Sequence, residues 1–321
     1  MFVVSALAFG AAGCDNAPTF PAAKVPKSVQ DIGRSEYDIN LKARVVGKTL
    51  GAVVYVPSLK DKTGQIAKEV HEVMSKAMQA VTRVALSTDL DLNYCVVFIR
   101  DVKTPQEIVI TRSVDDTRRG NADMIGMEEQ MRRTLIGQAV YKPAVEGPNS
   151  AFILRDIKKE DFLADQMVQR IHLLFAKPPK DEDESVDEAL IPESLVLVDG
   201  NYDRSHGKRS FTFAVIALRK EDPIQMMLSI FSEISAVIEG YKFEDYDRVE
   251  IQDFINRRKL IVDRQTLTLY QQKKISEQEL VERCLVESQS MQEALKLVGF
   301  VTPQDASDDA PASPAAVGAK P

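Results

Sequence analysis

The sequence predicts an α+β fold made of two small modules, each an antiparallel sheet with helices, followed by a helical C-terminal extension. Three observations lead to this prediction. Runs rich in β-branched and aromatic residues alternate with stretches in which apolar residues recur every three or four positions. Gly, Asn and Asp clusters separate these runs at the spacing of turns. A proline break followed by an acidic block, Pro178–Glu184, divides the chain near its middle.

The first fourteen residues predict export. Met1–Ala12 carries no charge and is shorter than the roughly 20 apolar residues that cross a bilayer, but it has the length of a signal-peptide core. Ala11-Ala12-Gly13-Cys14 resembles the lipobox of bacterial lipoproteins, with Ala11 where leucine is usual. This resemblance covers the N-terminus alone. It implies that residues 1–13 are a cleaved signal peptide and that Cys14 carries the lipid. A buried N-terminal strand or helix with a chance cysteine is the alternative.

Residues 14–36 are predicted to be a lipid anchor and flexible tether. Pro18, Pro21 and Pro26 are spread through a stretch rich in Ala, Lys and Asn that offers little to bury. Together with the lipobox resemblance, this places the chain on a membrane of the cell envelope, facing the periplasm or the exterior.

Residues 37–176 are predicted to form the first module. Gly47-Lys48-Thr49 has the composition of a hairpin turn between two strands, and Asp61 and Thr63 offer caps for a following helix. The expected elements are strands at 37–46, 50–56, 92–102, 107–113 and 152–154, and helices at 66–84, 127–139 and 159–175. The proline break and charge block then indicate a linker at 177–193.

Residues 194–252 are predicted to form the second module. Asp222-Pro223 is a typical helix start, with a capping residue followed by proline at the first helical position. Strands are expected at 194–199, 209–218 and 247–252. Both Lys48–Asp101 and Lys208–Asp253 run strand, helix, acidic turn, strand, which predicts a ββαβ duplication, with convergent patterning as the alternative.

Residues 253–300 are predicted to form helices at 253–272 and 277–298. Ser276 and Glu279 have the spacing of a capping box. The remaining tail, 301–321, is rich in Pro, Ala, Ser and Asp and is predicted to be disordered.

Composition narrows the classes of function. The 321 residues include 41 Lys and Arg against 48 Asp and Glu, a net charge of −7, which argues against nucleic acid as a partner. The three cysteines leave Cys95 and Cys284 after lipidation. Two separate buried thiols are favoured over a disulfide, which export would permit.

No motif for catalysis, cofactor or metal binding is recognisable. His71, His172 and His206 are isolated and show no metal-ligand spacing. Two sets of oxygen side chains around glycine turns faintly suggest calcium, although ordinary turn chemistry explains them better: Asp115, Asp116 and Asp123, and Asp199, Asn201 and Asp203. The pairs Arg118-Arg119 and Arg132-Arg133 could bind an anion only if the fold brought them together.

The sequence therefore predicts a membrane-anchored envelope lipoprotein that acts as a non-enzymatic binding or assembly module, held by the lipid on Cys14 and bound to an envelope protein. One alternative is an envelope hydrolase or transferase with dispersed active-site residues, recognisable by a pocket with several carboxylates or a base. Another is a small-ligand-binding lipoprotein with a cleft lined by aromatic residues such as Tyr202, Phe211, Phe213 and Tyr246.

Overall fold

The structure is a computed structural model that describes residues 20–176, 194–218 and 222–287. The predicted signal peptide, Cys14, the predicted linker at 177–193 and the tail at 301–321 lie outside the described residues. The chain divides into two compact units, with the boundary between Phe162 and Leu163. Each unit contains one five-stranded sheet with helices, so the α+β class and the arrangement in two modules are confirmed.

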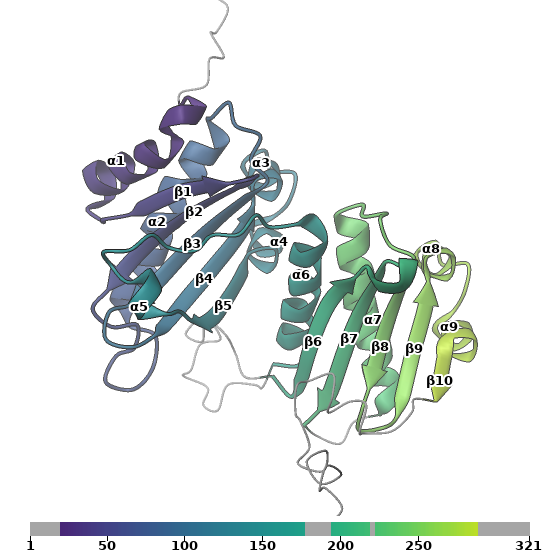
Figure 1. The fold of residues 1–321 in the computed structure, drawn as a ribbon. Helices are drawn as coiled ribbons and strands as arrows, with labels where there is room; N and C mark the ends of the chain where they lie inside the picture. The colour runs from purple at the N-terminus through teal and green to yellow at the C-terminus, as the bar shows by residue number, and fades with distance from the viewer. Residues whose placement is uncertain (1–19, 177–193, 219–221, 288–321) are drawn as a thin grey trace, which may run out of the picture. The chain divides into compact units, whose positions relative to one another are not determined.

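The first unit contains a sheet in the order β1-β2-β3-β4-β5 (Figure 1). Its elements are η1 (Ala22–Lys24), α1 (Val25–Tyr37), β1 (Lys42–Val46), β2 (Thr49–Val56), α2 (Lys68–Leu86), β3 (Tyr94–Asp101), β4 (Gln106–Ser113), α3 (Val114–Asn121), α4 (Met127–Arg132), β5 (Leu135–Val140) and α5 (Pro143–Glu146). Strand pairs are antiparallel except β2 and β3, which are parallel, so the sheet predicted to be antiparallel is mixed. A helix returns the chain between β2 and β3, and such a crossover makes neighbouring strands parallel.

Helix α1 corrects the predicted tether of residues 14–36 over its described part, which begins at Phe20. Val25, Val29 and Ile32 recur on one helical face, and all three are buried in the core formed with α2 and the sheet. Pro26 lies in the first turn, where its missing N–H removes no intrahelical hydrogen bond. Pro26 therefore marks the start of a helix, and the predicted strand at 37–46 shortens to Lys42–Val46.

Two further predictions in this unit are wrong. Residues 127–139, expected as one helix, form α4 and then β5, because Leu135–Val140 completes its hydrogen bonds along β4. Residues 152–154 are not a strand. They belong to a segment that crosses the sheet face opposite α2 (Figure 1), where Phe152 and Leu154 pack on Val53 and Val96. The carbonyl of Phe152 accepts a hydrogen bond from Arg44 at 2.9 Å.

The second unit repeats the first. Its elements are α6 (Lys159–Leu174), β6 (Val196–Asp203), η3 (Ser205–Gly207), β7 (Ser210–Ala217), α7 (Pro223–Gly240), β8 (Arg248–Asp253), β9 (Arg258–Asp263), α8 (Arg264–Gln271), α9 (Glu277–Cys284) and β10 (Leu285–Glu287). The sheet order is β10-β9-β8-β7-β6, again with one parallel pair, β7 and β8, joined by a helix. The predicted repeat is confirmed as a structural repeat, and it extends beyond ββαβ to helix, two strands, helix, two strands, two helices and a strand.

Residues 253–287 correct the described part of the helical extension predicted at 253–300, and residues 288–300 lie outside the described residues. The carboxylate of Asp253 accepts hydrogen bonds from the backbone of Ile255 and Asn256, at 3.0 and 3.1 Å, and Arg257 adopts a left-handed φ of 53°. This turn reverses the chain into β9. The capping box of Ser276 and Glu279 is present, but α9 ends at Cys284, because the chain becomes extended and pairs with β9. These elements complete the second sheet.

Helix α6 belongs to the second unit, although the sequence placed it at the end of the first. Phe162 stays with the first unit, and the boundary falls in the first turn of α6 rather than at the proline break. His172 of α6 accepts the backbone N–H of Val198 in β6 at 3.3 Å. A Cβ on Gly200 of β6 would come within 2.8 Å of Val168. Glycine thus permits the close packing of α6 on β6.

The helix-facing core of the first unit contains Leu50, Val97 and Ile108 from the sheet, with Ala77 and Val81 from α2. No helix among the described residues is both long enough and apolar enough to cross a membrane.

Candidate functional site

A polar groove of about 610 Å³ lies on the helix side of the first sheet. We call it the Arg112 groove. Residues from α1, α2, β4, α3 and α4 line it, together with Ser87 beyond the end of α2: Tyr37, Ser75, Met78, Gln79, Thr82, Arg83, Leu86, Ser87, Arg112, Thr117, Asn121 and Gln130. Hydroxyl, amide and guanidinium groups dominate this lining. None of these described lining residues is an aspartate, a glutamate, a histidine or a cysteine.

Arg112 reaches the groove from the core-facing side of β4. Ile108 and Ile110, four and two residues earlier, are buried in the helix-facing core, and alternation along a strand places Arg112 on the same face. Its cross-strand neighbour is the buried Cys95. Burial, slightly opposed by this thiol, lowers the pKa of the Arg112 guanidinium, which nevertheless stays charged at neutral pH.

Arg112 has only one hydrogen-bond partner within the described residues. Its Nε donates to the hydroxyl of Thr134 at 3.1 Å, and no carboxylate pairs with it there. Its two terminal nitrogens are therefore available to a ligand. Two buried arginines of this unit do form ion pairs: Arg100 pairs with Glu107 and Glu146, and Arg133 pairs with Asp116 and Glu129.

Hydroxyl groups add further donors. The Oγ1 atom of Thr82 is shielded from solvent and has no hydrogen-bond partner among the residues described. Ser75 accepts a hydrogen bond from Gln79 at 3.0 Å, which leaves the serine proton free to be donated. Thr117 differs, because its hydroxyl donates to the carbonyl of Ser113 at 3.0 Å. Arg83, at the rim, pairs with Glu36.

Equivalent interactions align the two units residue by residue. Lys48 pairs with Asp91 just before β2 and β3, and Arg209 pairs with Asp245 just before β7 and β8. Ser113 caps α3 by accepting the N–H three residues on. Asp263 caps α8 in the same way. The turns after α3 and α8 share their hydrogen bonds and each contains one left-handed residue, Asp123 and Lys273.

This alignment shows that the second unit fills the position of the groove. Arg112, Thr117 and Gln130 correspond to Val262, Leu267 and Leu280, all of which are fully buried. A ring also replaces a glycine: Gly120 corresponds to Tyr270, which packs against Phe231 of α7 at a centroid distance of 5.4 Å. The same fold is therefore closed and apolar in one unit and open and polar in the other.

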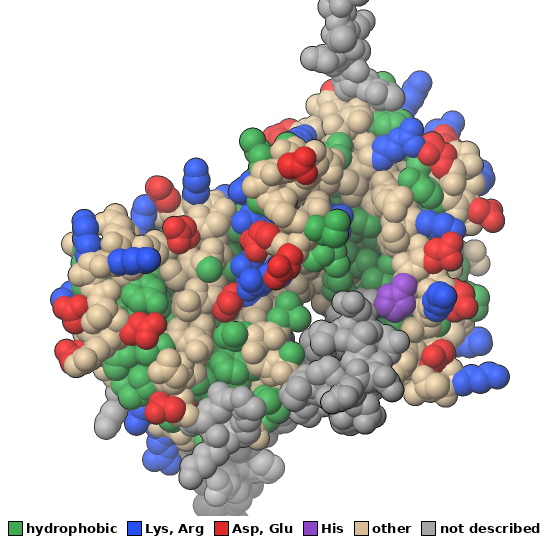
Figure 2. All heavy atoms as spheres, turned by 180° about the vertical axis from the view of Figure 1, so that it is seen from behind, with side chains coloured by type: hydrophobic (Ala, Val, Ile, Leu, Met, Phe, Trp, Pro, Cys, Tyr) green, Lys and Arg blue, Asp and Glu red, His purple; other side chains and the backbone are tan. Residues whose placement is uncertain are grey.

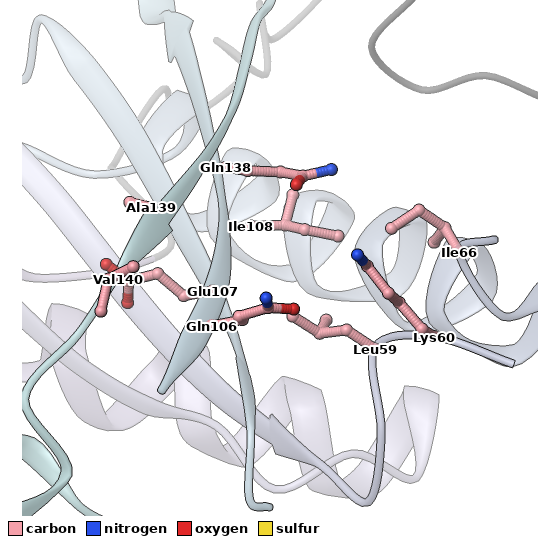
Figure 3. Close-up of a pocket in the computed structure, with 9 residues that line it drawn as sticks. All are labelled: Leu59, Lys60, Ile66, Gln106, Glu107, Ile108, Gln138, Ala139 and Val140. Atoms are coloured by element: carbon pink, nitrogen blue, oxygen red, sulfur yellow. The ribbon is translucent and has the colours of Figure 1, made fainter. Parts of the chain in front are cut away.

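A smaller pocket, of about 150 Å³, lies beside the ends of β4 and β5 (Figure 3). Lys60, Gln106 and Gln138 line it on one side of the strands. Figure 3 shows Glu107 on the other side of β4, where it is committed to Arg100 at 2.7 Å. Because its one carboxylate is already paired, this pocket offers less chemistry than the Arg112 groove.

The structure does not bring the sequence-predicted polar residues together as a binding site. Arg119 and Arg133 do converge, but on Asp116, at 3.9 and 2.8 Å. That carboxylate therefore takes part in an ion-pair cluster rather than in a calcium loop. Among the described residues, no three His, Cys, Asp or Glu side chains are placed to hold a metal ion.

The aromatic residues proposed to line a cleft are part of the packing of the second unit. Phe211, Phe213 and Tyr246 are buried, and Tyr202 stacks edge-on against Phe211 at 5.0 Å. Cys95 and Cys284 are both free and buried.

Arg112 was not identified from the sequence, although a signal was present. Ile108, Ile110 and Arg112 follow the two-residue period of a strand, so a charged residue occupies a position expected in the core.

On the face seen in Figure 2, acidic and basic side chains are interspersed. Comparison of the chain with known protein families, with curated proteins and with solved structures gives no match.

Proposed function

We propose that this chain is a membrane-anchored lipoprotein of the bacterial envelope, that it acts as a non-enzymatic binding module, and that the Arg112 groove is its binding site. The observation that carries the proposal is the difference between the two units. Val262, Leu267 and Leu280 close the second unit, and Arg112, Thr117 and Gln130 keep the first one open.

An open polar groove is costly where the same fold can bury apolar side chains instead. Filling such a space commonly stabilises a protein, and sites that forgo this stability are typically functional. Ligand sites are concave and hold a few polar groups at defined positions. The lining of donors, without a carboxylate or histidine, favours binding over the hydrolase or transferase alternative.

The location in the envelope is supported by the residues before the fold. The segment at 1–13 resembles a signal peptide, and ten residues separate Cys14 from Val25, where α1 begins. A lipid on Cys14 would hold the first unit close to a membrane, on the short chain that precedes α1.

A protein partner is the second candidate. Three methionines on the α3–α4 turn and on α4 are unusually exposed: Met124 at 72%, Met127 at 81% and Met131 at 58%. Methionine-rich surfaces adapt to apolar partners. The corresponding residues in the second unit are Lys274, Glu277 and Val281, so this surface also distinguishes the units.

Two measurements test the proposal. In the first, the full chain is expressed in a bacterial host, and labelled fatty acid is followed in wild type and in Cys14→Ser, with globomycin blocking the lipoprotein peptidase. Label that depends on Cys14, with precursor accumulating under the drug, supports the anchor. An unlabelled cytosolic product contradicts it.

The second measurement is native mass spectrometry of the chain purified from its host. The comparison variant carries Thr117→Leu and Gln130→Leu, which give the groove the residues of the second unit. A ligand carried by wild type and missing from the filled variant supports the binding site. A ligand retained equally by both, or by neither, contradicts the proposal that the groove is where binding occurs.

A further inference from the structure

We infer that the Arg112 groove recognises an anionic group, and specifically a phosphate, through the two terminal nitrogens of Arg112. This inference rests on the proposed function, in that it assigns a ligand class to the same groove. Three observations carry it: an arginine without a carboxylate partner among the described residues, hydroxyl groups in the lining of the same groove, and an apolar counterpart in the second unit.

The unpaired guanidinium is the first. A buried charge is normally compensated by an opposite charge, as Arg100 and Arg133 are in this unit. Arg112 is half-buried and its Nε is held by Thr134, so the guanidinium is oriented but not neutralised. A ligand with two oxygens could accept two parallel hydrogen bonds from the terminal nitrogens.

The remaining donors favour phosphate over a carboxylate. Thr82 has a shielded hydroxyl without a partner, and the hydroxyl of Ser75 still has its proton to donate. A carboxylate that binds Arg112 in a fork has little acceptor capacity left, whereas a phosphate presents further oxygens to such hydroxyls. Among the described residues that line the groove, none is acidic and would repel either anion.

The second unit provides an internal comparison. At the position of Arg112 it has the fully buried Val262, and at the position of Thr117 it has the fully buried Leu267. The fold thus does not require an arginine on this strand. Its presence in the first unit coincides with the space and the hydroxyls that an anion needs.

The test is a calorimetric titration of the full chain with inorganic phosphate, with sodium chloride at equal ionic strength as the blank and acetate as the second anion. We expect saturable phosphate binding that is tighter than acetate binding. Arg112→Gln should weaken it at least about tenfold, because charge-assisted hydrogen bonds are lost. Arg118→Gln is the matched control, since it removes the same charge from an exposed position on α3 outside the groove, and it should leave the affinity unchanged.

A second variant keeps the test valid if Arg112→Gln folds poorly. Arg112→Lys retains the positive charge but not the fork of donors, so phosphate affinity should fall to an intermediate value. Phosphate binding that is unaffected by both Arg112 variants would overturn the inference, as would acetate binding more tightly than phosphate, or no phosphate binding.

Two further arms locate the source of the phosphate. Vesicles of phosphatidylglycerol are compared with vesicles of phosphatidylcholine, in wild type and in Arg112→Gln. Arg112-dependent binding to phosphatidylglycerol indicates a lipid headgroup, and binding of free phosphate alone indicates a solute. If neither probe binds but native mass spectrometry finds a ligand that the filled variant loses, the groove is a binding site without phosphate specificity. In that case the inference fails and the proposed function stands.

Discussion

At the residue scale, the buried Arg100 and the half-buried Arg112 of the first unit differ in their ion pairs. Arg100 is 1% exposed and donates to Glu107 and Glu146, both at 2.7 Å. Burial would raise the pKa of Glu146, but hydrogen bonds from Arg100 and from backbone N–H groups hold that pKa below its usual range. Arg100 thus fixes the segment after β5 to the sheet, whereas Arg112 holds no carboxylate within the described residues.

Removal of Arg100 should be strongly destabilising. Arg100→Met leaves two buried carboxylates without their partner, and breaking a buried pair from one side costs about 3–5 kcal/mol. Chemical denaturation would measure this loss. Arg83→Met is the matched control, because it breaks an exposed pair with Glu36 worth about 0–1 kcal/mol. Equal losses in both variants would contradict the structural role of Arg100.

The second unit should lose stability in mild acid through His172. Burial lowers the pKa of this imidazole, and its Nε2 can accept the N–H of Val198 only while the ring is neutral. Because the folded pKa lies below the unfolded value of about 6.5, the contribution is complete above that pH. It is lost as pH falls through the folded value.

The measurement is the free energy of unfolding of wild type and His172→Gln between pH 7 and pH 5. Wild type should lose more stability over this interval than the variant. Parallel curves would show that His172 does not titrate with the predicted sign.

At the scale of elements, the sequence predicted helix starts correctly where residues close in sequence form the capping hydrogen bonds. The N-cap of α7 accepts from Ile224 and Gln225, as Asp222-Pro223 predicts. The start of α9 shows the predicted capping box. The ends of elements were less predictable, because β5 and β10 form where a neighbouring strand offers its edge.

Helix α1 should behave as part of the core and not as a tether. Ile32→Ala removes a buried side chain from its contact with α2 and the sheet, which should cost about 2–5 kcal/mol of unfolding free energy. Arg34→Ala, two residues later on the exposed face, should change it by less than about 0.5 kcal/mol. Denaturant titration distinguishes the two outcomes. A tether would tolerate both substitutions equally.

At the scale of the whole molecule, the two units share one fold but differ in the side chains that fill it. The order of helices and strands, the single parallel pair and the capped helix after the fourth strand recur in both units. The two units differ in the side chains at the position of the groove, which are polar in the first unit and apolar in the second. They close the second unit and leave the first with the Arg112 groove.

Reciprocal exchange should therefore have opposite effects. Thr117→Leu with Gln130→Leu should raise the unfolding free energy by about 0.5–2 kcal/mol, because apolar side chains fill the groove. Leu280→Gln should lower it by about 2–5 kcal/mol, because a fully buried leucine is replaced by an amide. Thermal and denaturant unfolding measure both. Destabilisation by the double exchange would show that the two units are not equivalent at these positions.

The sequence by itself determined the α+β class, the internal repeat and the caps of α7 and α9, because these depend on periodicity and on hydrogen bonds between neighbouring residues. Only the tertiary structure decided that α1 and α6 belong to the units that follow them, that 258–263 and 285–287 are strands, and that Arg112 faces a groove. These features depend on which surface each segment meets after folding. The spacing of Val25, Val29 and Ile32 is compatible with burial, but it does not show which helix or sheet these side chains pack against. An arginine in a strand likewise becomes a site only when the helix opposite it carries Gly120 in place of Tyr270.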